Sequence, residues 1–373
     1  MGNLLGNVLP LPLRERGVFI HRLAALLLLL LTLSAHAEPS CANPQQMDGF
    51  KTCANVANSE QEGKLVVYST DPESAAEAVL GRFRAAFPKI TTTYLRLQGG
   101  ALYARLLAER QGGVFTADIA QLADMGFALD FQKRGGYMRY VSPEIGAYKP
   151  EYRSTPEGEW TWGALVVAGI AYNPRLVTAA EAPHDWPDVL DPKWADAISV
   201  KVTISGLQHT TWFVLREKYR DDFWQKLMPS KPHAFDSYVQ QFDRLVNGQD
   251  KVAITAQYSG YLLMKSKGAP VEFVYPPGGL TATPQPWGIV KEAPHPAAAQ
   301  LFLDWFLDWF LSVPGQTANV QYQYTNSLRN DVPPPPGGVS ASTFKLLMPA
   351  DWHAIEQSHA QYVREWNKLT GMR

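Results

Sequence analysis

Short apolar runs and amphipathic stretches alternate along the chain from about residue 62. Lys64–Tyr68 (KLVVY) is a compact apolar run that predicts a buried strand. The apolar residues after it recur at helical spacing and predict a helix that ends before Pro88. We expect Asp71 to cap this helix and Pro72 to take its first position, where a missing N–H costs nothing. The pair predicts the first strand–helix unit of an α/β fold.

The same alternation continues towards the C-terminus. It predicts strands over residues 91–97, 117–120, 160–173, 198–202, 251–256, 271–275 and 287–290. It predicts helices from Gly99 and from about Gly206, and over residues 125–131, 239–246, 258–266, 295–311 and about 352–369. Such alternation is typical of parallel strands with right-handed crossovers. Because the strand over 160–173 is longer than its neighbours, the pattern predicts two α/β lobes joined by long strands.

The segment between that long strand and the second α/β set reads WPDVLDPKWADAISV (Trp186–Val200). Asp185 can cap a short helix with Pro187 in its first turn, and Asp191-Pro192 predicts the turn that ends it. No titratable groups converge on the segment, so we interpret it as a structural connector into the second lobe.

The tetrad LDWF occurs twice in succession, at Leu303–Phe306 and Leu307–Phe310. It makes the predicted helix apolar nearly all round, so we expect burial on more than one side. Asp304 and Asp308 share a face at i,i+4, and we interpret them as solvated or edge residues.

The N-terminus has the pattern of a secretory signal peptide. Three arginines precede an apolar run over Leu23–Leu33, and Ala35-His36-Ala37 is a small-x-small cleavage site. The run is shorter than the roughly 20 residues that a membrane-spanning helix needs. We therefore expect cleavage after Ala37 and an exported, soluble protein.

Charge and composition narrow the class further. The net charge is −1, and loss of three arginines and one glutamate with residues 1–37 makes it −3, which does not suit a nucleic-acid binder. Eleven tryptophans and a hydrophobic content of 46% predict a large core, at a length that suits two domains. Cys41 and Cys53, the only cysteines, predict a local disulfide in an oxidising compartment. A metal or haem site is the rival interpretation, although the histidines lack ligand spacing.

Motifs for exported enzymes are missing. We find neither Gly-x-Ser-x-Gly nor His-Glu-x-x-His, and no convincing pair of carboxylates at predicted cleft positions. The sequence therefore favours a protein that is not an enzyme and that carries no cofactor or resident metal.

Several segments together resemble one protein family. They are KLVVYST (Lys64–Thr70), GGALYARLLAE (Gly99–Glu109), TADIAQLADM (Thr116–Met125), AYNPRLV (Ala171–Val177), WPDVLDPKW (Trp186–Trp194), GAPVEFVYPPGG (Gly268–Gly279) and APHPAAAQLFLDW (Ala293–Trp305). In this order they resemble bacterial extracytoplasmic solute-binding proteins of ABC importers, in the type 2 periplasmic-binding fold. The similar branch includes ferric-ion, phosphonate, sugar-phosphate and thiamine binders.

The resemblance implies an α/β fold of two lobes, with a mixed central sheet in each lobe and crossing strands as the hinge. We expect lobe 1 over 62–163 and 284–331 and lobe 2 over 164–283. A signal peptide (1–37) and a disulfide-bearing extension (38–61) precede them, and a Pro-rich linker with a C-terminal helix (332–373) follows. The resemblance further implies a periplasmic monomer that closes on a small-molecule ligand and delivers it to an ABC permease in the inner membrane.

Ligands in open α/β sheets lie beyond the carboxyl ends of the strands, where helix N-termini favour anions. The residues predicted there are Ser69, Thr70, Gln98, Gly99, Gly100, Ser205, Gly206 and Tyr258. Ordinary helix capping is the alternative at each position. Trp162, with Trp160 and Tyr258, is a candidate aromatic wall, for which hinge packing is the alternative.

Ferric binders of the family use two consecutive tyrosines where this chain has Tyr258-Ser259. They often have a histidine where it has Asp71-Pro72, and relatives carry an arginine for a companion anion near Val166 and Ala168. The sequence therefore favours an organic anion: a carboxylate, phosphonate or phosphate-bearing compound. Ferric iron remains an alternative ligand, and the presentation of a ligand to a signalling receptor remains an alternative role.

Overall fold

The structure is a computed structural model that describes residues 41, 43–202, 205–235, 237–307, 312–324, 327, 332–339, 343 and 345–371. The chain divides into two compact units, residues 1–42 and 43–373, and the fold below is that of the second. The predicted signal peptide lies outside the described residues. Among the residues that are described, no helix is long and apolar enough to cross a membrane.

Three parallel strands form one end of the sheet: β3 (Lys64–Ser69), β4 (Thr91–Arg96) and β5 (Ile119–Gln121). Each is followed by a helix, namely α3 (Glu73–Ala86), α4 (Gly99–Gln111) and α5 (Met125–Lys133). These elements match the predicted strand–helix units. The predicted cap is wrong, because Pro72 is the N-cap of α3 and no side chain bonds the helix end. The Asp71 carboxylate instead accepts a hydrogen bond from Gln285.

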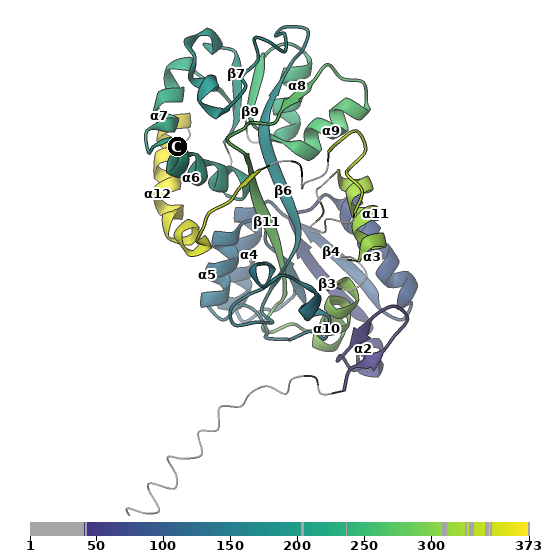
Figure 1. Ribbon diagram of the computed structural model, residues 1–373. Helices are drawn as coiled ribbons and strands as arrows, with labels where there is room; N and C mark the ends of the chain where they lie inside the picture. The colour runs from purple at the N-terminus through teal and green to yellow at the C-terminus, as the bar shows by residue number, and fades with distance from the viewer. Residues whose placement is uncertain are drawn as a thin grey trace, which may run out of the picture. The chain divides into compact units, whose positions relative to one another are not determined.

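Two long strands run through the middle of the unit, β6 (Thr161–Tyr172) and β11 (Leu280–Ile289), and they pair antiparallel with each other. β11 also pairs with β5, and β6 pairs with β9 (Val252–Gln257). With β7 (Ile198–Lys201) and β8 (His233–Phe235) beyond β9, the strand order β4-β3-β5-β11-β6-β9-β7-β8 makes one continuous mixed sheet. The crossing strands therefore connect the sheets of the two lobes edge to edge (Figure 1).

The second α/β set contains β7 (Ile198–Lys201), β8 (His233–Phe235), β9 (Val252–Gln257) and β10 (Glu272–Val274). Its helices are α6 (Leu207–Tyr219), α7 (Phe223–Leu227), α8 (Tyr238–Val246) and α9 (Tyr258–Ser266). The connector forms two 3-10 turns, Trp186–Leu190 and Pro192–Trp194, and Asp185 caps the first as predicted. Three more 3-10 turns cover Ile145–Ala147, Pro150–Tyr152 and Met228–Ser230.

The crossing strand β6 meets its neighbours with two irregularities. The register to β11 shifts where Gln285 faces Ala164 and Pro286 faces Trp162, which leaves Gly163 as an extra residue. The register to β9 shifts around Thr255, whose φ of 55° lies in the left-handed region. Both are β-bulges, which add twist where they occur.

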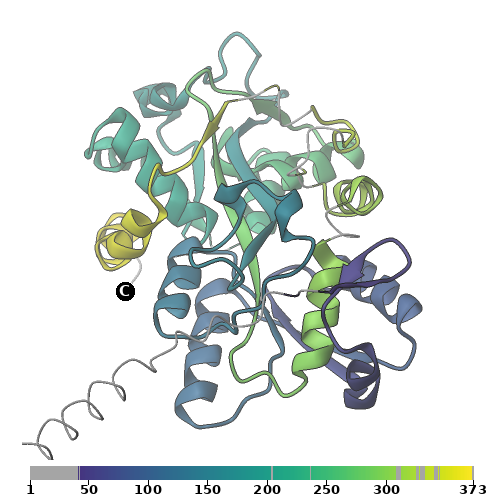
Figure 2. The ribbon, with the colours of Figure 1, turned by 60° about the horizontal axis from the view of Figure 1, so that its bottom comes forward.

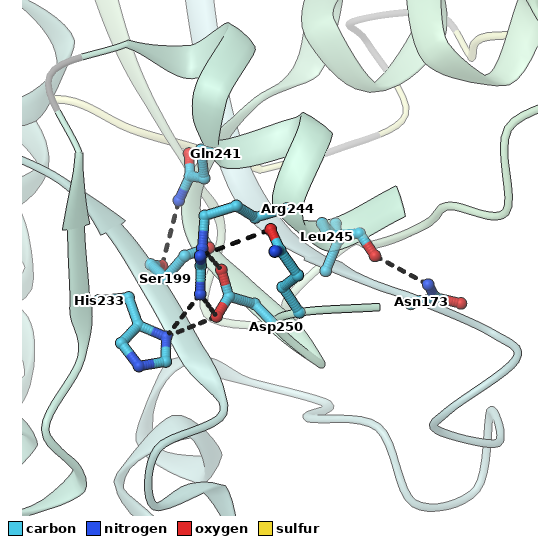
Figure 3. A network of polar contacts seen from close by, with 8 residues as sticks. Asn173, Ser199, His233, Gln241, Arg244, Leu245 and Asp250 are labelled. Carbon is cyan, nitrogen blue, oxygen red and sulfur yellow. Dashed lines mark hydrogen bonds and ion pairs between the residues drawn. The ribbon is translucent and has the colours of Figure 1, made fainter. Parts of the chain in front are cut away.

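A network of polar contacts ties β8, α8 and β9 together at the amino ends of the two strands, away from the predicted ligand positions (Figure 3). The buried Asp250 carboxylate accepts from Arg244 Nε at 2.8 Å and contacts His233 Nδ1 at 2.5 Å. The Gln241 amide donates to the carbonyls of Ser199 and Ile254. These contacts fix the helix on the sheet, so we interpret the network as scaffold.

The N-terminal extension folds as a hairpin of β1 (Gln45–Gln46) and β2 (Lys51–Thr52) followed by α2 (Val56–Glu62). Both Cys41 and Cys53 are disulfide-bonded. The extension packs against α10 (Pro296–Trp305), which is buried on several sides as predicted (Figure 2). The interpretation of Asp304 as a solvated or edge residue is wrong. Its buried carboxylate accepts from Thr52 Oγ1 at 2.6 Å, from the Cys53 N–H and from the Tyr140 hydroxyl. Asp308 lies outside the described residues.

The C-terminal part contains α11 (Val313–Gln323), β12 (Leu346–Leu347) and α12 (Trp352–Thr370). The strand β12 pairs parallel with the start of β11. The predicted linker over 332–338 is partly packed, because Val332 is buried and Val339 donates its N–H to the Tyr258 hydroxyl. Helix α12 lies against both α5 and α6 (Figure 1).

Candidate functional site

The carboxyl ends of β3 and β5 form a compact polar cluster. Gln121 Oε1 accepts hydrogen bonds from Ser69 Oγ at 2.8 Å and from Thr70 N and Oγ1, both at 2.9 Å. The two hydroxyls predicted to face a ligand therefore bond a neighbouring strand. Gln121 is fully buried, and its Nε2 group has no hydrogen-bond partner among the described residues. Sequence reasoning missed Gln121, although a glutamine that ends the buried run ADIAQ was a usable signal.

Asp71 lies next to this cluster, between β3 and α3. Gln285 Nε2 of the crossing strand β11 donates to its Oδ1 at 3.0 Å. Burial raises the pKa of Asp71 to about 6, although the hydrogen bond from Gln285 and the charge of Arg96 act in the opposite direction. The cluster thus contains a carboxyl group whose charged form is disfavoured by burial.

The starts of α4 and α6 meet across the two lobes. Gln98 is the N-cap of α4, but its side chain makes no cap hydrogen bond. Ordinary helix capping, the alternative to a ligand role, therefore does not occupy this side chain. A Cβ placed on Gly99 would lie 3.3 Å from Ser205 Oγ, whereas Gly100 faces open space. The structure therefore brings together Gly99 and Ser205, two of the predicted site residues.

The N-terminus of α6 binds a carboxylate of the protein itself. Gly206 is its N-cap with φ 65°, and its N–H donates to Asp124 Oδ2. A Cβ on Gly206 would lie 3.1 Å from the Ala123 carbonyl oxygen, so only glycine fits this turn without strain. The predicted anion-binding N–H of Gly206 is thus already bonded, and Asp124 is a residue that sequence reasoning missed.

Gln208 follows in the first turn of α6 and is 1% exposed. Both its Oε1 and its Nε2 lack a hydrogen-bond partner within the described part of the chain. A buried amide without partners costs free energy, which a polar ligand can recover by bonding it. Gln208 is therefore a second unpredicted candidate for ligand contact.

Tyr258 does not lie as expected for a ligand contact. It is 1% exposed, and its hydroxyl bonds the Tyr275 hydroxyl at 3.1 Å and accepts the Val339 N–H at 3.0 Å. Its ring packs on Phe273 at 5.0 Å between centroids. The C-terminal segment thus covers the start of α9, and a direct ligand role for this hydroxyl requires that segment to move.

Trp162 is buried in a different hydrophobic cluster from Tyr258, so the predicted aromatic wall is not assembled. Its ring stacks on Tyr152 at 5.1 Å and meets Trp352 edge-on at 6.1 Å. Trp160 donates its indole N–H to Gln132. Hinge packing, the alternative interpretation, agrees with these contacts.

The described residues include no group of three or more His, Cys, Asp or Glu side chains that could hold a metal ion. The acidic groups near the strand ends, Asp71 and Asp124, each bond protein donors instead.

A sequence model of a family described as bacterial extracellular solute-binding protein matches residues 114–309. The chain belongs to this family. Proteins of this kind bind small ligands outside the cytoplasm and serve ABC transporters, which agrees with the expected periplasmic role. An uncharacterized protein of Haemophilus influenzae is 25% identical over 263 residues, which cover 65% of this chain and 72% of that protein.

Solved structures share the two-lobe fold of this solute-binding protein. Iron-bound HitA from Pseudomonas aeruginosa is 19% identical with a TM-score of 0.70, over 82% of this chain and 99% of HitA. AfuA from Actinobacillus pleuropneumoniae, solved with fructose-6-phosphate, is 20% identical with a TM-score of 0.69, over 83% of this chain and 99% of AfuA. These likenesses confirm the predicted type 2 fold. Since one of these proteins holds iron and the other a sugar phosphate, the fold leaves the ligand open.

Proposed function

We propose that this solute-binding protein captures a small organic anion in the cleft between its lobes and delivers it to an ABC permease. Lobe 1 is assigned to residues 62–163 and 284–331, and lobe 2 to residues 164–283. Hinge closure brings both walls onto the ligand, so the ligand selects the closed state. The protein acts as a monomer in the periplasm, without catalysis.

The observation that carries this proposal is the pair of buried glutamines with unsatisfied amides. Gln121 Nε2 ends a first-lobe strand, and the Gln208 amide lies in the first turn of a second-lobe helix. An unpartnered N–H group donates to a hydrogen-bond acceptor, and a carboxylate, phosphonate or phosphate oxygen is such an acceptor. The start of α4 at Gly99 and Gly100 adds a positive dipole end on the first-lobe wall, whereas the start of α6 is already bonded by Asp124.

The charges nearby favour a ligand of low charge. The carboxylates of Asp71 and Asp124 lie near the predicted positions and repel a dianion. Arg96, which acts on Asp71, is exposed. A monocarboxylate or another singly charged anion therefore suits the site better than inorganic phosphate.

Ferric iron is the second candidate, and one observation favours it. Tyr275 places a second phenol hydroxyl 3.1 Å from that of Tyr258, although the two residues are far apart in sequence. Burial raises the pKa of Tyr275 well above its usual range, which opposes the tyrosinate that iron requires. A protein that stays colourless with ferric citrate rules out this candidate, because ferric–tyrosinate absorbs visible light.

Mass spectrometry of small molecules released from the purified protein tests the main proposal. A thermal-shift screen of carboxylates, phosphonates and sugar phosphates follows. We expect one anion class to raise the melting temperature, and no stabilisation by any of them contradicts the proposal. The result would be the same if the protein presented its ligand to a sensor kinase rather than to a permease.

Two variants test the glutamines. Gln121→Glu and Gln208→Glu each keep one acceptor oxygen and replace the unpartnered N–H donors by a negative oxygen. We expect at least about a tenfold loss of affinity for the anion found in the screen, because a charge-assisted hydrogen bond is replaced by repulsion. The control Gln111→Glu adds the same charge at an exposed position of α4 and should bind normally. If all three variants bind the anion with equal affinity, Gln121 and Gln208 do not contact the ligand.

A further inference from the structure

Three helices meet at one buried junction. Asp124 at the start of α5 caps its own helix through the Phe127 N–H at 3.2 Å and accepts the Gly206 N–H at the start of α6. His209 of α6 lies with Nδ1 3.7 Å from Asp124 Oδ2, and its Nε2 meets Ser358 Oγ of α12 at 3.1 Å. Asp124 is 2% exposed and His209 is fully buried. A first-lobe helix, a second-lobe helix and the C-terminal helix thus share one polar cluster.

The C-terminal helix α12 is anchored on the second lobe by aromatic packing. The Tyr362 ring stacks on His209 at 4.6 Å and 8°, and Trp366 meets Trp224 edge-on at 5.0 Å. Tyr362 and Trp366 are both buried. Arg216 adds an ion pair with Glu365 at 3.5 Å. Buried aromatic pairs of this kind stabilise packing beyond their area, so they hold α12 on the second lobe.

The same helix also lies on the first lobe. A Cβ on Gly126 of α5 would lie 3.4 Å from the Glu356 Cα, so the two helix backbones approach closely there. The Phe127 ring meets His359 at 4.9 Å, and Lys133 pairs with Glu356 at 3.4 Å. The contact with α5 is less aromatic than the contact with α6, where Tyr362 packs on both His209 and Trp212.

We propose that Asp124, together with α12, is a clasp between the lobes that holds their relative orientation in the ligand-free protein. Asp124 is a positioning residue in this proposal, since it acts on the α6 end of the cleft and not on a ligand. The ligand-free protein therefore has one preferred lobe orientation. The free energy of the clasp opposes a ligand that binds a different orientation and favours a ligand that binds the same one.

The surroundings of Asp124 favour its charged form. Burial alone raises its pKa, but His209 and the Gly206 N–H outweigh burial and hold the pKa below its usual range. The carboxylate therefore stays charged, and the positive end of α6 stabilises it. Removing a buried charge-assisted hydrogen bond of this kind shifts a two-state equilibrium by about tenfold or more.

The test measures the distance between the lobes without any ligand. Spin labels on cysteines introduced at Gln111 in α4 and Val239 in α8, both exposed, report that distance by pulsed electron resonance. The native cysteines are disulfide-bonded and do not take the label. The protein is first unfolded, dialysed and refolded to remove small molecules that purify with it.

Asp124→Asn keeps the cap of α5, because asparagine caps a helix as well as aspartate does, but it removes the charge. Ser358→Ala removes only the hydroxyl that bonds His209. The control Asp130→Asn lies on the same helix, where its carboxylate bonds Arg134 and Tyr103 within the first lobe.

We expect one narrow distance distribution for the unaltered protein and for Asp130→Asn. Asp124→Asn and Ser358→Ala should add a second population, with a ratio of populations changed about tenfold for Asp124→Asn. A broad distribution in the unaltered protein overturns the proposal. A narrow distribution in both clasp variants overturns it as well.

Discussion

Asp71 offers the sharpest test of the electrostatics at the strand ends. Its pKa rises from 3.8 to about 6 because burial disfavours the charged form. The folded protein therefore binds this proton more tightly than the unfolded chain does. The stabilising contribution is fully present below pH 3.8 and is lost as the pH rises through about 6. A pKa difference of this size corresponds to about 3 kcal/mol in the free energy of unfolding.

Asp71→Asn removes this dependence, because the amide cannot ionise and its oxygen still accepts from Gln285. We expect the variant and the unaltered protein to differ little in stability near pH 4. The variant should become more stable by up to about 3 kcal/mol near pH 7.5. Urea unfolding followed by circular dichroism at several pH values gives the difference curve, in which the contributions of other groups cancel.

Asp221→Asn is the matched control, since the Asp221 side chain is 89% exposed, and its difference curve should be flat. A flat curve for Asp71→Asn would refute the reasoning, because Asp71 would then be charged in the fold at no cost. A curve that falls with pH would show that Arg96 and Gln285 stabilise the carboxylate more than burial opposes it.

Three further substitutions test the packing. Trp366→Ala should lower the free energy of unfolding by roughly 3–5 kcal/mol, because it empties a buried site against Trp224; a loss below about 1 kcal/mol in urea unfolding would contradict the anchoring of α12. Gly206→Ala should cost roughly 1–3 kcal/mol, since φ is 65° and the Ala123 carbonyl is close, and an unchanged melting temperature would refute that strain. Asp304→Ala leaves three donors without their acceptor and should cost roughly 3 kcal/mol, with faster proteolysis of the N-terminal hairpin as the local readout.

Hydrophobic periodicity was enough to predict most of the fold. The strand–helix units around β3, β4, β5 and β9 lie where the apolar patterns place them. The strands β3, β5 and β9 are apolar runs that are buried nearly throughout, and a helix such as α3 buries one periodic face. The crossing strand β11 was predicted only from residue 287, although it begins at Leu280. Pro284 and Pro286 have no backbone N–H to donate to a neighbouring strand, so the local sequence does not predict a strand there. Pairing on both sides and full burial outweigh that local preference.

The candidate site was less predictable, because it depends on contacts between distant segments. Ser69 and Thr70 lie at the expected strand end, but the sequence does not show that Gln121, some 50 residues on, takes their hydrogen bonds. Tyr258 lies at the expected helix start, yet the segment around Val339 covers it. Asp304 looks like a surface residue until the N-terminal hairpin is placed on it. Each outcome was decided by a long-range contact that local patterns do not encode.

The two bulges along β6, one in β6 itself and one in its partner β9, have a consequence for the motion between the lobes. One has Gly163 of β6 as its extra residue and the other has Thr255 of β9, opposite Gly169 and Ile170, so a regular stretch of β6 separates them. Each bulge is a place where a sheet bends without losing its neighbouring pairs. The sheet that joins the lobes thus has two places where it can bend, one in β6 and one in β9. We therefore expect lobe closure to combine two bends rather than to follow a single hinge axis.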